Sequence, residues 1–161
     1  MARRAELIFK GLNRVLVTGP HRAGTTITTE IVAEELGLPA VRESELAHPR
    51  FPGDDEPSLS MEDVLKLERG VLQGATTFKW LPTIGQHFDA VVIVKRNIAD
   101  IQKSQKRYRG RYLDDPLEKY HRLQHMPLPL KIWVSYEELL SKHERFCTDR
   151  SGWAPRQTTP C

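Results

Sequence analysis

Cysteine is scarce in this chain, which has two in 161 residues, Cys147 and Cys161, both near its C-terminal end. Their positions lack the spacing of a zinc site, and one pair does not define a disulfide, so we expect no metal centre. The sequence also has no hydrophobic run near the roughly 20 residues that cross a bilayer. Lys10, Asn13 and Arg14 interrupt the apolar stretch that follows the basic N-terminal residues, which argues against a secretory signal. We therefore expect a cytoplasmic protein with no membrane partner.

A strong excess of one charge is missing as well. The 24 Lys and Arg residues exceed the 21 Asp and Glu residues by only three, so nucleic acid is not the expected partner. A local pocket for a small polyanion is compatible with this balance. At this length, a hydrophobic content of 39% is sufficient for the core of one domain. We assign that domain to residues 1–147 and expect residues 148–161 to form a poorly ordered tail.

Short hydrophobic runs alternate with segments of helical periodicity along the chain. Strands are predicted at 14–18, 39–43, 75–80, 90–94 and 130–134, and helices at 25–36, 60–70, 97–108, 116–125 and from 135 onward. This alternation predicts an α/β fold of three layers, with a parallel β-sheet flanked by helices. Ligands bind such sheets at the carboxyl ends of the strands, so the functional residues should follow Thr18, Lys79 and Lys95.

The first of these strand ends opens into a loop that contains two glycines. It reads Gly19-Pro20-His21-Arg22-Ala23-Gly24-Thr25-Thr26 and leads directly into a helix. Glycines allow a tight turn whose amides face an anion, and the helix dipole adds positive potential. A P-loop would have lysine at position 25, but threonine stands there and Arg22 supplies the cation. An ordinary strand-to-helix turn with capping threonines is the alternative.

The strongest strand, 90–94, is followed by a second group of polar residues. Arg96 stands at its end, and Ser104 comes eight residues later, about two helical turns further on. A guanidinium and a hydroxyl in this arrangement can converge on one phosphate. Taken alone, both residue types are also common on ordinary protein surfaces.

Together these segments resemble the P-loop sulfotransferases that use 3′-phosphoadenosine 5′-phosphosulfate (PAPS). The resemblance rests on 22–26, on Arg96 with Ser104, on Lys79-Trp80-Leu81-Pro82 and on the segment 134–139. It implies a P-loop fold and transfer of a sulfuryl group from PAPS to a hydroxyl or amine of a small-molecule or polymer acceptor. Adenosine 3′,5′-bisphosphate (PAP) is the implied product, and no metal is implied. The implied cofactor-binding residues are Gly19, His21, Arg22, Ala23, Gly24, Thr25 and Thr26 at the 5′-phosphosulfate, and Arg96 and Ser104 at the 3′-phosphate.

The same resemblance implies catalytic roles. Arg22, assisted by Lys79, would stabilise the negative charge that develops on the bridging oxygen as the sulfur–oxygen bond breaks. A general base must also take a proton from the acceptor. Many cytosolic members carry a histidine in the segment that corresponds to 78–82, where this chain has none. Glu43 matches the glutamate of tyrosylprotein-type and bacterial members, with Glu45, His21, His48 and His87 as alternatives.

Two other function classes remain open. In a nucleotide kinase or related P-loop phosphotransferase, the basic stretch 103–111 would cover the phosphates as a lid. Thr25 in the lysine position and the lack of an acidic magnesium ligand at a strand end argue against it. A catalytically silent nucleotide-binding module is the third class. The basic stretch is also compatible with an electrostatic funnel, with nucleic-acid contacts or with a solvated helix end.

Overall fold

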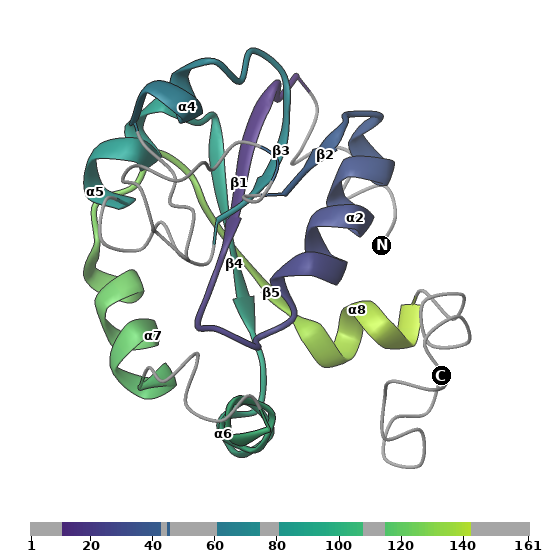
Figure 1. The fold of residues 1–161 in the computed structure, drawn as a ribbon, viewed down its shortest axis with the longest axis vertical. Helices are drawn as coiled ribbons and strands as arrows, with labels where there is room; N and C mark the ends of the chain where they lie inside the picture. The colour runs from purple at the N-terminus through teal and green to yellow at the C-terminus, as the bar shows by residue number, and fades with distance from the viewer. Residues whose placement is uncertain (1–10, 43–44, 46–60, 75–80, 108–114, 143–161) are drawn as a thin grey trace, which may run out of the picture.

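The computed structural model describes residues 11–42, 45, 61–74, 81–107 and 115–142 (Figure 1). Five parallel strands form one sheet in the order β2-β3-β1-β4-β5. The strands are β1 (Arg14–Thr18), β2 (Ala40–Val41), β3 (Gly70–Gln73), β4 (Ala90–Lys95) and β5 (Lys131–Ser135). The predicted α/β fold with a parallel sheet is confirmed.

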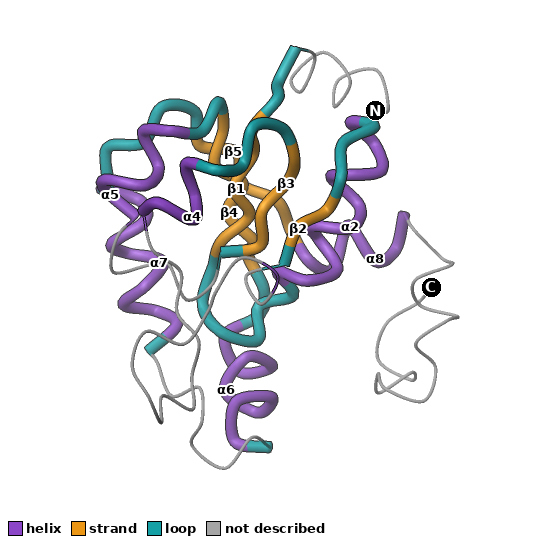
Figure 2. The backbone as a smooth tube through the Cα atoms, turned by 45° about the horizontal axis from the view of Figure 1, so that its top comes forward, coloured by secondary structure: helices purple, strands orange, loops and turns teal. Residues whose placement is uncertain are grey.

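Helices cover both faces of this sheet (Figures 1 and 2). They are α2 (Thr25–Leu36), α4 (Met61–Leu65), α5 (Leu81–Ile84), α6 (Ile98–Lys106), α7 (Pro116–His125) and α8 (Tyr136–Lys142), with a 3₁₀ turn, η2, at Gly85–His87. Each of them, within the residues that the structure describes, is too short or too polar to cross a membrane.

The alternation of side chains along β1 divides the core into two halves. Val15 and Val17 face one side, where they join a cluster with residues of α2 and α8. Leu16 faces the other side and joins a cluster with residues of α4, α5 and α7. All three β1 side chains are completely buried, as expected for a strand covered on both faces.

Local capping sets the ends of several helices. Gly37, in the left-handed conformation with φ of 66°, ends α2. The Asn97 side chain accepts a hydrogen bond from the Asp100 amide at the start of α6, and the Ser135 hydroxyl accepts one from the Glu138 amide at the start of α8.

The third strand is where sequence and structure differ. The prediction that Gly70 ends a helix is wrong, because α4 ends at Leu65 and Gly70 begins β3. The Gly70 amide donates to the Asn13 carbonyl at 2.8 Å, and a Cβ at Gly70 would lie 3.1 Å from the Pro39 carbonyl oxygen. Glycine is therefore needed where β3 passes between its neighbours. The strand predicted at 75–80 lies outside the described residues.

The strand order places the point where adjacent strands lead to opposite faces of the sheet at the carboxyl end of β1. From β1 the chain continues through α2 on one face of the sheet, and from β3 it continues through α5 on the other face. Ligands of open α/β sheets bind where adjacent strands lead to opposite faces in this way. The loop that follows β1 lies at this point.

Candidate functional site

The loop between β1 and α2 makes a tight turn that leads directly into the N-terminus of α2. Arg22 has φ of 70° and Gly24 has φ of 96°, so both lie in the left-handed region. The Ala23 amide closes a tight turn by donating to the Pro20 carbonyl at 3.1 Å. Gly24 is the N-cap of α2 and has no side chain to cap the first amides of the helix. Loops of this kind present amides to an anion at the positive end of a helix.

Both glycines of the loop are required by close contacts. A Cβ at Gly19 would lie 3.1 Å from the Val94 carbonyl oxygen of β4. A Cβ at Gly24 would overlap the aromatic ring of Tyr136, the first residue of α8. The loop is therefore packed between the ends of β4 and β5, and its glycines are not merely flexible points.

Side chains that follow β4 hold the loop from one side. The Arg96 Nη1 donates to the Arg22 carbonyl oxygen at 2.7 Å, and the Gln105 Nε2 donates to the His21 carbonyl oxygen at 3.0 Å. The Arg22 Nε donates to the Ser104 Oγ at 3.1 Å. The structure thus brings together Arg22, Arg96 and Ser104, which the sequence analysis assigned to one ligand.

Two tyrosines fix the position of Arg96. The Tyr120 hydroxyl, from α7, donates to the Val94 carbonyl at 2.7 Å and accepts from the Arg96 amide at 3.0 Å, so it bridges the end of β4. The Arg96 guanidinium stacks on the Tyr136 ring, 4.5 Å from its centroid. Its Nε is buried and has no hydrogen-bond partner, and no carboxylate of the described ranges forms an ion pair with it. This cation therefore contributes positive potential at the loop.

Gln73, the last residue of β3, is a site residue that the sequence analysis missed. Its Nε2 lies 2.7 Å from the Thr26 Oγ1 and 3.3 Å from the Thr25 Oγ1, so it donates to both hydroxyls. Because the strand was predicted at 75–80, Lys79 was expected at this edge in its place. The polar residue directly after the hydrophobic pair Val71-Leu72 was the signal that identifies the end of this short strand.

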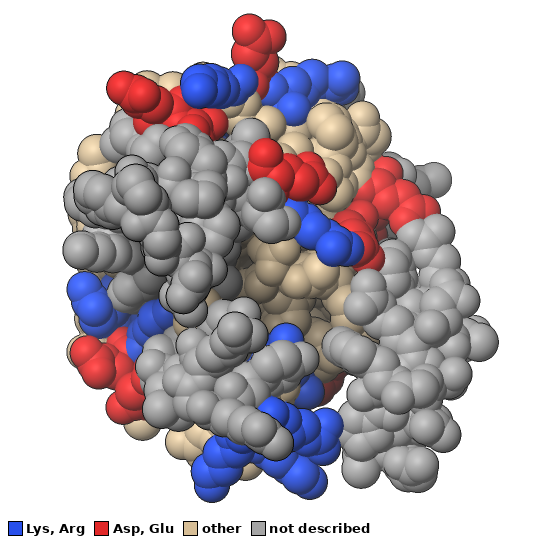
Figure 3. Space-filling model, in the orientation of Figure 1, with Lys and Arg blue, Asp and Glu red and all other residues tan. Residues whose placement is uncertain are grey.

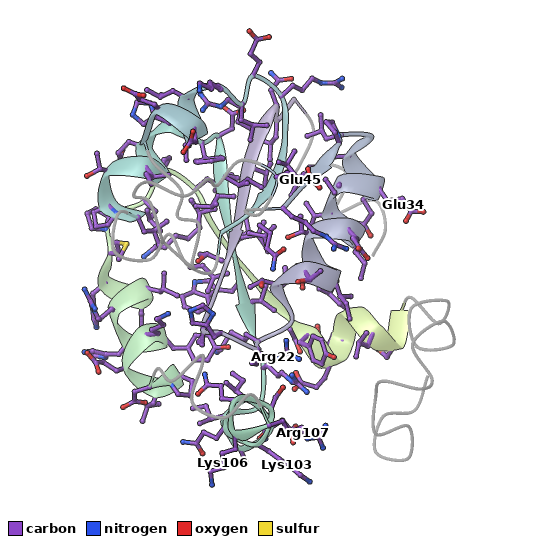
Figure 4. All side chains as sticks on the ribbon, in the orientation of Figure 1. Arg22, Glu34, Glu45, Lys103, Lys106 and Arg107 are labelled. Atoms are coloured by element: carbon purple, nitrogen blue, oxygen red, sulfur yellow. The ribbon has the colours of Figure 1, made fainter. Side chains whose placement is uncertain are left out.

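The candidate bases that the structure describes, Glu45, His21 and His87, lie at different places in the fold. Glu43, Lys79 and His48 lie outside the described residues. Glu45 is exposed and lies near the end of β2, well apart from Arg22 in Figure 4. His87 precedes β4 and therefore lies at the amino edge of the parallel sheet, opposite the loop. Of the alternatives to Glu43 that the structure describes, only His21 belongs to the loop itself.

The helix α6 has two different faces. Ser104 and the buried Gln105 contact the loop, whereas the exposed side chains on the opposite face are Lys103, Lys106 and Arg107. Figure 4 shows these three basic side chains pointing outward, and Figure 3 shows a group of basic residues at this end of the molecule. The remaining residues of the predicted basic stretch, 108–111, lie outside the described residues.

Within the described part of the chain, no group of three or more His, Cys, Asp or Glu side chains is placed to hold a metal ion. His121 and His125 of α7 contact each other edge to face, with 4.8 Å between ring centroids.

No model of a known protein family matches the chain, and no curated protein sequence matches it. The function proposed for the chain therefore rests on the geometry of the loop and its neighbours.

Proposed function

We propose that the chain is a PAPS-dependent sulfotransferase, which transfers a sulfuryl group from PAPS to a hydroxyl or amine acceptor. The observation that best supports this function is that Arg96 and Ser104, which follow Arg22 by 74 and 82 residues in the sequence, both contact Arg22 at the loop after β1. A nucleotide with phosphates at both the 5′ and 3′ positions needs two adjacent anion sites, one at the loop and one beside it.

The side chains and amides at this site suit such a ligand. The amides of the loop and the hydroxyls of Thr25 and Thr26 would bind the 5′ end of the nucleotide. Arg96, buried at Nε and without a carboxylate partner among the described residues, would bind the 3′-phosphate together with Ser104. At present the two guanidinium groups donate to uncharged oxygens, and a phosphate would give them anionic acceptors, with which arginine forms its strongest hydrogen bonds.

The proposed reaction exchanges one bond to sulfur for another. The bond between sulfur and the bridging oxygen of the phosphosulfate breaks, and a bond from sulfur to the acceptor oxygen or nitrogen forms. The electron pair of the broken bond stays on the phosphate of PAP, next to the Arg22 guanidinium, which stabilises it. The acceptor proton passes to a general base, for which Glu43 is our candidate, and Lys79 would assist Arg22.

The residue at the end of β3 argues against the alternative phosphotransferase function. A P-loop phosphotransferase holds magnesium with a loop hydroxyl and an aspartate. Here an amide, Gln73, contacts the hydroxyls of Thr25 and Thr26. The loop also has threonine in the position where the lysine of such enzymes contacts the phosphates.

Calorimetry with PAP and with Mg²⁺–ATP distinguishes these functions. We expect PAP to bind in the presence of EDTA, and to bind more tightly than adenosine 5′-phosphate (AMP), which lacks the 3′-phosphate. Tighter binding of Mg²⁺–ATP, lost on addition of EDTA, would support the phosphotransferase. Binding of PAP without any release of PAP from PAPS, over a panel of phenol, alcohol and amine acceptors, would support the silent binding module.

A further inference from the structure

The position of Gln73 is fixed by the backbone on both of its sides. In the register of the sheet it pairs with Val17 of β1. The next residue, Gly74, donates from its amide to the Val17 carbonyl at 2.8 Å and accepts at its carbonyl from the Thr18 hydroxyl at 3.0 Å. The Gln73 side chain is therefore held at a defined place beside the loop, where it reaches the first two residues of α2.

The contact between Gln73 and the two threonines has a direction. The amide nitrogen is a donor only, so each threonine hydroxyl accepts from it through an oxygen lone pair. The hydroxyl protons of Thr25 and Thr26 then remain available for another acceptor. The anionic oxygen of a ligand at the loop is such an acceptor, and it lies on the same side as the N-terminal amides of α2.

A carboxylate at the same place would have the opposite effect. It would accept the hydroxyl protons, and it would place a negative charge next to the bound anion. With a threonine hydroxyl it would also form part of an oxygen site for Mg²⁺, which binds through carboxylates and ligand phosphates. The neutral amide of Gln73 supplies neither the charge nor a metal ligand of this strength.

We propose that Gln73 is a specificity-determining residue, which directs the Thr25 and Thr26 hydroxyls toward the ligand and makes the loop select a metal-free phosphate or phosphosulfate ester. A magnesium complex of a nucleoside triphosphate is correspondingly disfavoured. The proposal deepens the sulfotransferase function and rests on it for the identity of the nucleotide. The role of Gln73 at the loop is separable from that identity.

Three proteins test the proposal: the wild type, Gln73→Glu and Gln73→Met. The glutamate variant keeps the size of the side chain and adds a charge, whereas the methionine variant removes the donor without adding a charge. Calorimetry with PAP and with AMP, each with EDTA and with Mg²⁺, measures binding at the loop. We expect wild-type binding to be independent of Mg²⁺, and Gln73→Glu to weaken metal-free binding by roughly tenfold or more at pH 7.5.

A pH profile separates this role from a merely structural one. The glutamate carboxyl becomes neutral as the pH falls toward its ordinary pKa of about 4.3, and then it donates as the amide does. The affinity of Gln73→Glu, divided by that of the wild type, should therefore rise as the pH is lowered from 7.5 to 5. Addition of Mg²⁺ at pH 7.5 should also raise this ratio. The affinity of Gln73→Met should be reduced severalfold at both pH values, with no response to Mg²⁺.

Several outcomes overturn the proposal. The proposal is contradicted if Gln73→Glu binds the nucleotides as tightly as the wild type at pH 7.5. It is also contradicted if the ratio of the two affinities does not change with pH, or if the wild type needs Mg²⁺ to bind. If Gln73→Glu does not fold, as judged by its thermal unfolding, an unchanged affinity of Gln73→Met is the contradicting result. Equal binding of PAP and AMP, with the expected effects of Gln73→Glu on both, would reject the sulfotransferase and leave the role of Gln73 supported.

Discussion

Arg96 Nη1 and the carbonyl oxygen of Arg22 are 2.7 Å apart, so the end of β4 is hydrogen-bonded to the backbone of the loop after β1. The two residues are 74 positions apart in the sequence. Arg96 therefore has two expected effects, one on the shape of the loop through Nη1 and one on a bound anion through its charge. These effects are separable by the choice of ligand.

Replacement of Arg96 by alanine should weaken PAP binding by roughly tenfold or more, because a hydrogen bond to a charged group is lost. AMP, without a 3′-phosphate, should lose less affinity, through the altered loop alone. Calorimetry with both ligands measures the difference. Arg42→Ala is the matched control, since this exposed arginine pairs with Glu30 and should leave both affinities unchanged. Equal losses of affinity for PAP and AMP would show that Arg96 does not bind the 3′-phosphate.

Gly24→Ala should reduce the free energy of unfolding by about 3 kcal/mol, because it adds both a backbone cost and an overlap with Tyr136. Gly37→Ala is a matched control. Gly37 also has positive φ, but nothing lies within 4 Å of the position of its Cβ, so only the backbone cost of about 1 kcal/mol applies. Denaturant unfolding of both variants measures the difference. Equal losses would show that Tyr136 does not limit the space at Gly24.

Tyr120→Phe removes a hydroxyl that bonds to two backbone groups at the end of β4. We expect a loss of about 1 to 3 kcal/mol in the free energy of unfolding, and weaker PAP binding because Arg96 is less well positioned. Thermal unfolding and calorimetry measure the two effects. Leu117→Ala, at a side chain that is 63% exposed on the same helix, is the control and should change neither. Unaltered PAP binding by Tyr120→Phe would show that Arg96 does not depend on this bridge.

Glu43→Gln should reduce the rate of sulfuryl transfer by about 100-fold or more while PAP affinity is retained, since the loss of a general base affects the reaction and not the binding. The rate of PAP release from PAPS, with an acceptor found in the panel, is the measurement. Glu45→Gln is the control and should leave the rate unchanged, because Glu45 lies apart from Arg22. If Glu43→Gln keeps the full rate and Glu45→Gln loses it, the general base is Glu45 and not Glu43.

The parallel sheet could be predicted because its central strands have a strong local signal. Val15 to Val17 and Val91 to Val94 are continuous hydrophobic runs, and each precedes a segment of helical periodicity. The strand β3 has four residues and begins at a glycine, so no periodicity distinguishes it from the end of a helix. The short α5 and η2 were missed for the same reason.

The site could be predicted in part because strand ends of a parallel sheet meet at one edge. This rule correctly placed Arg96 and Ser104 beside the loop of Arg22. The contacts of Tyr120, Gln105 and Gln73 with this site join segments far apart in the sequence. No local pattern marks such contacts, because they depend on how α7, α6 and β3 pack against β1 and β4.

The ring of Tyr136 forms a wall of the loop, since it fills the space beside Gly24 and supports Arg96. A fragment of the chain that stopped before residue 136 would contain the whole loop sequence and all five strands, and yet it would lack that wall. The space beside Gly24 is therefore closed only when the chain extends beyond β5 into α8. A binding assay on such an N-terminal fragment would test the loop without the Tyr136 ring, and it would therefore underestimate the affinity of the loop in the intact chain.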